Sequence, residues 1–121
     1  MPFRYILANV LAQTEDAVGV LFLDESGETV ELACSTLSPD DMRLLGAYVG
    51  IYLRQIARFV DAETYGEVAW LQVEDRELNV YAVPLAEGYH LILAQRSPGL
   101  TAVARRNLEQ ARVQLVRELF P

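Results

Sequence analysis

Apolar residues recur along the first part of the chain, first with helical and then with strand-like spacing. Positions 3, 6, 7, 10 and 11 are apolar, which predicts an amphipathic helix from Pro2 to about Gln13. Residues 18–23 form a strand-like apolar run, and the turn-forming sequence Asp-Glu-Ser-Gly separates this run from a second strand-like segment, residues 29–34. A helix followed by a β-hairpin is therefore expected.

The next segment has the features of a helix N-terminus. Ser38 is a favourable N-cap, Pro39 suits the first helical position, and Asp40 and Asp41 lie where the helix dipole favours negative charge. No proline follows within the apolar periodic stretch. We predict a long helix from Pro39 to about Asp61.

Three β-rich runs and a last helix complete the chain. The runs are Glu67 to Glu74, Leu78 to Leu85 and Tyr89 to Gln95, and their short links predict an antiparallel meander. Ser97-Pro98-Gly99 then opens a helix. Its apolar stripe comprises Leu100, Ala104, Leu108, Ala111, Leu115 and Leu119. These patterns therefore predict one α+β domain that spans residues 1–121. Its elements are expected in the order helix, two strands, long helix, three strands, helix.

The apolar arc of the long helix is too wide for a single partner surface. At 100° per residue it covers roughly 200°, whereas a helix resting on a sheet needs little more than about 100°. The arc comprises Met42, Leu45, Gly46, Tyr48, Val49, Gly50, Tyr52, Leu53, Ile56, Ala57, Phe59 and Val60. We expect the sheet to cover the side of Tyr48 and Val49 and a second copy to pack on the side of Gly46 and Gly50. The alternative is that a terminal helix of the same chain covers the surplus.

Arginines form a band outside this arc. Arg43, Arg54 and Arg58 align along the helix, with Ala47 among them. Such a band on an acidic protein is either an interface for an acidic partner surface or a solvated face paired with neighbouring carboxylates.

Composition excludes several classes of function. The net charge is −7, which disfavours binding of nucleic acid or an anionic membrane surface. No apolar run is long enough to cross a bilayer, and the N-terminus lacks the pattern of a signal peptide. Cys34 is the only cysteine, so an internal disulfide is impossible. A cytoplasmic protein is expected.

Motifs for chemistry are absent from the sequence. Neither a Gly-x-x-x-x-Gly-Lys-Ser/Thr loop nor a Gly-x-Gly-x-x-Gly turn occurs, so nucleotide binding by these mechanisms is not expected. The single histidine, His90, has no partner at metal-ligand or catalytic spacing. Paired carboxylates fall in predicted caps and turns. We therefore expect no catalytic, cofactor-binding or metal-binding residues.

The order of elements, together with the strand Val18 to Leu23 and the turn Asp24 to Glu28, resembles the roadblock family. The likeness covers nearly the whole chain and continues through the capped long helix, the meander and the entry into the last helix. It implies a five-stranded antiparallel sheet with the long helix on one face and both terminal helices on the other.

The resemblance also implies partners. Roadblock domains typically form homodimers by pairing the third strand and the long helix across a two-fold axis. The expected dimer surface comprises Met42, Gly46, Val49, Gly50, Leu53, Ala57, Val68 and Trp70. Bacterial members of the family often bind a Ras-like small GTPase that controls cell polarity or gliding motility. The expected partner-binding residues are Arg43, Ala47, Arg54 and Arg58. Stimulation of GTP hydrolysis is a further outcome that the resemblance implies.

Two other functions remain open at this stage. A scaffold subunit of a multi-protein complex would use the same surfaces as a GTPase regulator. A small-molecule sensor of longin-like or profilin-like architecture would instead use a pocket between the sheet and the long helix.

Overall fold

The computed structural model describes residues 2–60 and 62–121. The elements are α1 (Pro2–Gln13), β1 (Ala17–Leu23), β2 (Thr29–Cys34), α2 (Pro39–Phe59), α3 (Ala62–Tyr65), β3 (Leu71–Glu74), β4 (Leu78–Pro84), β5 (His90–Arg96) and α4 (Thr101–Leu119). The predicted order of elements is confirmed. The short helix α3 is an addition that the sequence pattern did not predict.

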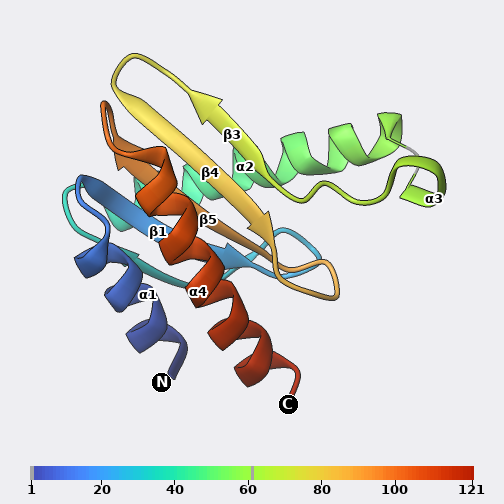
Figure 1. Ribbon diagram of the computed structural model, residues 1–121, viewed down its shortest axis with the longest axis horizontal. Helices are drawn as coiled ribbons and strands as arrows, with labels where there is room; N and C mark the ends of the chain where they lie inside the picture. Colours follow the sequence, from blue (N-terminus) through green and yellow to red (C-terminus); the bar gives the residue numbers. More distant parts are fainter. Residues whose placement is uncertain (1, 61) are drawn as a thin grey trace.

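The strands form one antiparallel sheet in the order β2-β1-β5-β4-β3. Figure 1 shows α1 and α4 side by side on one face of this sheet and α2 on the other. The predicted α+β architecture, with the long helix opposite the two terminal helices, is confirmed. Strands β2 and β3 are the two edges.

Alternating side chains of the sheet build a separate core on each face. Phe22, Tyr81 and Leu93 pack with α1 and α4 on one face, whereas Leu21 and Ile92 pack with α2 on the other. The inner strand β1 is buried along its whole length, because both of its faces are covered by helices.

The ends of α2 follow from local chemistry. The Ser38 hydroxyl accepts a hydrogen bond of 3.1 Å from the Asp41 amide, as the N-cap prediction requires. The helix ends at Phe59, where the Val60 amide donates to the Ile56 carbonyl. Asp61, the predicted end, lies outside the described residues.

The third strand is shorter than the sequence pattern predicts. We expected it to start at Glu67, but pairing begins at Leu71, which lies opposite Ala82. Continuing this register would set residue 69 opposite Pro84, which has no amide hydrogen to donate. Residues 67–70 therefore leave the ladder and run free of regular structure.

The last helix buries most of its predicted stripe. Ala104, Leu108, Ala111 and Leu115 are buried against the sheet and α1. Leu100 is an exception, because it precedes the first helical residue as the N-cap and is exposed. The sequence pattern also missed Asn107, which is buried and donates to the Gln13 carbonyl and the Thr14 hydroxyl at the end of α1.

Candidate interaction surfaces

The inward face of α2 consists largely of residues predicted to bind a second copy. Met42, Gly46, Val49, Gly50 and Leu53 are all buried against the sheet of the same chain. A β-carbon on Gly50 would come within 3.2 Å of Leu23 Cδ1, so this glycine admits a strand side chain and not a second helix. These five residues therefore face the sheet of their own chain, and the prediction that they form a dimer surface stays a prediction.

The outward face of α2 carries the surplus apolar surface instead. We define the outer stripe as Leu44, Tyr48, Ile51, Tyr52 and Phe59. Phe59 is 89% exposed, Leu44 56% and Tyr48 52%. These positions span roughly 100° of the helix. A stripe of large apolar side chains on one face of a helix is typical of a surface that another element covers.

The sequence pattern placed part of this stripe wrongly. The sheet was expected to cover the side of Tyr48 and Val49, and of these two only Val49 is buried. Leu44 and Ile51 were left out because they lie among polar residues at the margin of the apolar arc. Both are large apolar side chains outside the arc, and this could have indicated a second apolar surface on the helix.

The edge strand β3 provides a second open surface. It pairs only with β4, and Val73 is 45% exposed. An unpaired edge offers backbone donors and acceptors to another strand. Trp70, predicted to lie in the dimer surface, instead packs within the chain: its ring lies 5.4 Å from that of Tyr81, and the Arg105 guanidinium lies 4.5 Å over it.

The predicted arginine band is exposed along its length, with Ala47 among its residues. Arg43 forms an ion pair with Asp40 at 3.3 Å across one helical turn. This pair agrees with the alternative that the band is a solvated face paired with neighbouring carboxylates. Arg54 donates a long hydrogen bond of 3.5 Å to the Ser26 carbonyl in the β1–β2 turn. Arg58 lies in the last turn of α2, where a positive charge complements the helix dipole.

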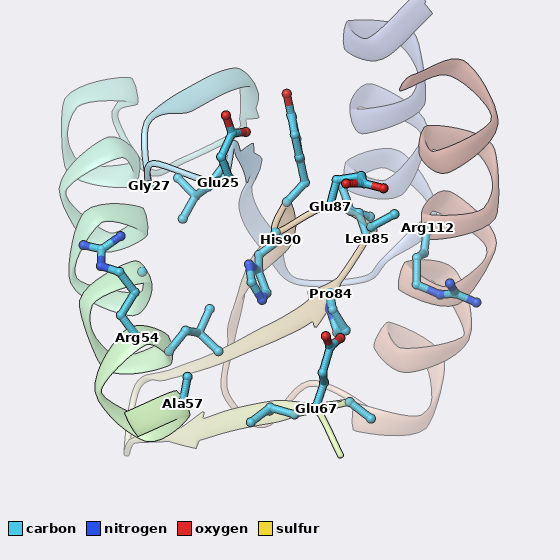
Figure 2. A pocket seen from close by; sticks show the side chains of 18 of the residues that line it. Glu25, Gly27, Arg54, Ala57, Glu67, Pro84, Leu85, Glu87, His90 and Arg112 are labelled. Carbon is cyan, nitrogen blue, oxygen red and sulfur yellow. The ribbon is translucent and has the colours of Figure 1, made fainter. Parts of the chain in front are cut away.

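A cleft of about 940 Å³ opens at one end of the sheet, and we call it the end cleft. Its walls come from the β1–β2 turn, the C-terminal half of α2, residues 66–69, the β4–β5 turn and α4. Figure 2 shows Arg54 on the α2 side, Arg112 on the α4 side and His90 between them. The predicted residues Ala57 and Val68 both line this cleft.

The two turns above the cleft touch each other. Gly88 has a φ of +83°, and a β-carbon there would come within 3.0 Å of the Glu25 β-carbon. Glu87 also adopts a positive φ of 53°. The tight β4–β5 turn thus brings Gly88 against Glu25, and both Glu25 and Glu87 line the cleft.

His90 lies in the cleft, and its surroundings shift its pKa. Burial lowers the pKa of its imidazole below 6.5, although a backbone hydrogen bond and the charge of Glu67 oppose this effect. No group of three or more metal-ligating side chains occurs in residues 2–60 and 62–121. Over the same residues no helix is both long enough and apolar enough to span a membrane.

Known structures share this fold, although the sequence itself matches no known family and no curated protein. A Roadblock/LC7 domain from Streptomyces avermitilis superposes with a TM-score of 0.81 at 14% identity, covering 98% of each chain. Myxococcus xanthus MglB gives 0.85 at 13% identity, covering 97% of this chain and 94% of MglB. An MglB with a tetrameric arrangement superposes with a TM-score of 0.84 at 15% identity, covering 96% of this chain and 88% of the MglB chain. The chain therefore has the Roadblock/LC7 fold.

Proposed function

We propose, from the Roadblock/LC7 fold of this chain, that it is a non-catalytic module that forms a homodimer and binds a Ras-like small GTPase. The outer stripe of α2 is the observation that carries this proposal. Five large apolar side chains are exposed on one helix face, and burying them against a second copy would remove a substantial apolar area from water.

The dimer is supported by the open edge of β3. Pairing of two β3 edges across a two-fold axis would extend the sheet and satisfy the free backbone groups of both strands. The similarity to an MglB with a tetrameric arrangement agrees with self-association through this fold. The interface that we propose comprises the outer stripe and β3, in place of the buried residues predicted from the sequence.

The GTPase is proposed from the resemblance to bacterial roadblock proteins and from the arginine band. Arg43, Arg54 and Arg58 lie on α2 next to the outer stripe, where they can contact an acidic surface that reaches across the dimer. Their role is contact, and any stimulation of GTP hydrolysis would act through groups of the GTPase itself. We place this role in the cytoplasm, in cell polarity or motility.

Two measurements test the proposal. Sedimentation velocity at micromolar concentration is expected to give the mass of a dimer, and a monomer would contradict it. Pull-down of Ras-like GTPases encoded near this gene, each loaded with GDP or a GTP analogue, is expected to recover one of them in a nucleotide-dependent manner. Binding that ignores the nucleotide would instead favour a scaffold subunit.

The sensor alternative finds no support in its predicted location. Buried side chains from the sheet and from α2, Leu21 and Met42 among them, fill the space between sheet and long helix. The end cleft lies elsewhere, at the end of the sheet.

A further inference from the structure

The end cleft combines an apolar lining with an acidic rim. Leu23, Leu53, Pro84 and Leu85 provide apolar lining. Glu25, Glu67 and Glu87 lie around it on three separate segments: the β1–β2 turn, the chain before β3 and the β4–β5 turn.

These three carboxylates are unpaired within the described part of the chain. The ion pairs found there are Arg4–Glu31, Arg43–Asp40 and Arg112–Glu109, and none involves the acidic rim. All three glutamates are also exposed. Their charges are therefore available to a ligand.

The arginines that line the cleft are already engaged. Arg112 forms a forked pair with Glu109, Arg105 lies over the Trp70 ring, and Arg54 reaches the Ser26 carbonyl. These contacts leave the charges of Arg54 and Arg105 in place, but carboxylates outnumber arginines in the lining, so the net charge of the cleft is negative. The carboxylates are Asp24, Glu25, Glu67, Glu87 and Glu109, and the arginines are Arg54, Arg105 and Arg112. Anionic ligands are disfavoured and cationic groups are favoured.

We propose that the end cleft binds a basic amphipathic segment of a protein partner, with its apolar side chains on the lining and its Arg or Lys side chains against Glu25, Glu67 and Glu87. The volume of about 940 Å³ is near the top of the range of about 300–1,000 Å³ for clefts that hold drug-sized ligands, so several side chains of such a segment have room to enter. Neutral His90 adds a hydrogen-bond acceptor between the two walls, since its ring N–H is engaged with the Gly88 backbone.

This site is separate from the proposed dimer surface, although it shares Arg54 with the arginine band. The outer stripe lies on the α2 face that points away from the sheet, whereas the cleft is lined by Gly50, Leu53 and Ala57 on the inner side. A basic segment and a second copy could therefore bind together, and failure of one proposal leaves the other intact.

The test uses a fluorescein-labelled peptide of alternating arginine and leucine, followed by fluorescence anisotropy. The triple variant Glu25→Gln, Glu67→Gln, Glu87→Gln is expected to weaken its binding about tenfold or more. The matched control, Glu15→Gln, Glu77→Gln, Glu118→Gln, makes the same charge change at exposed positions away from the rim and outside β3. It is expected to leave binding within about twofold.

Two further readouts decide between a built site and general attraction to an acidic protein. Because His90 is the only histidine, its ring NMR signals report on the cleft without ambiguity, and the peptide is expected to shift them. An analogue with glutamate in place of arginine is expected not to bind. Equal weakening in both triple variants, unshifted His90 signals, or competition by spermidine at the affinity of the peptide would each overturn the proposal.

Discussion

Gly46 lies so close to Leu21 that a β-carbon on the glycine would come within 2.9 Å of Leu21 Cδ2. Leu21 is fully buried in β1 between β2 and β5, so its side chain has little room to move. The missing side chain of Gly46 is what allows α2 to approach the central strands. This contact explains why a small residue of the long helix faces the chain's own sheet.

Gly46→Ala is therefore expected to destabilise the fold. Alanine should gain about 1 kcal/mol in helix propensity, but overpacking against Leu21 costs about 1–3 kcal/mol, giving a net loss of roughly 1 kcal/mol. Gly50→Ala is the control, because its new β-carbon meets Leu23 less closely, at 3.2 Å. Urea unfolding of both variants checks the difference, and an equally stable or more stable G46A would contradict the packing argument.

The outer stripe predicts the oligomeric state. The double variant Tyr48→Glu, Tyr52→Glu places two charges in the proposed dimer interface and is expected to give a monomer at micromolar concentration, because buried unpaired charges are costly. Sedimentation velocity measures the mass. Gln110→Glu, Gln114→Glu on the exposed side of α4 makes the same charge change and should leave the mass unaltered.

Arg58 predicts partner binding with only a small effect on stability. Its side chain is exposed at the end of α2, so Arg58→Glu is expected to weaken binding of the GTPase about tenfold while the free energy of unfolding falls by no more than about 1–2 kcal/mol, the scale of reversing a charge at a helix C-terminus. Isothermal titration calorimetry gives the affinity. Arg106→Glu on α4 serves as the charge-matched control. An equal loss of affinity in that variant would contradict the proposal that the arginine band binds the GTPase.

His90 predicts a dependence of stability on pH. Because burial lowers the pKa of its imidazole below 6.5, the unfolded chain binds the proton more readily than the folded chain. Stability is therefore fully present above pH 6.5 and falls as the pH drops from there toward the folded pKa. Denaturant unfolding at about pH 7.5 and about pH 5.5 should show a larger loss in wild type than in His90→Gln. Parallel losses would contradict the assignment.

The buried amide of Gln95 leads us to expect a large loss of stability when a methyl group is added at Gly99. Its Oε1 accepts a hydrogen bond of 2.9 Å from the Tyr81 hydroxyl, and its Nε2 donates one of 2.9 Å to the Glu15 carbonyl. A β-carbon on Gly99 would overlap this buried amide. Gly99→Ala is expected to cost about 2–4 kcal/mol of unfolding free energy. Tyr81→Phe, which removes only one of these hydrogen bonds, should cost less in the same urea titration.

The order of the elements, their approximate bounds and the Ser38 cap could all be predicted from the sequence. They depend on local spacing, turn residues and capping, which act within a few positions along the chain. The α+β class follows from the same patterns. The shortened β3 could not be predicted in this way, because it depends on Pro84, a residue of the neighbouring strand.

Only the tertiary structure decided which side of α2 faces the sheet. An apolar arc of roughly 200° has two sides of similar character, and helical periodicity cannot tell them apart. From the sequence, Gly46 and Gly50 could face either a second helix or a strand. In the structure they lie against Leu21 and Leu23 of β1. The end cleft was equally hidden, because its acidic rim is assembled from three segments that only folding brings together.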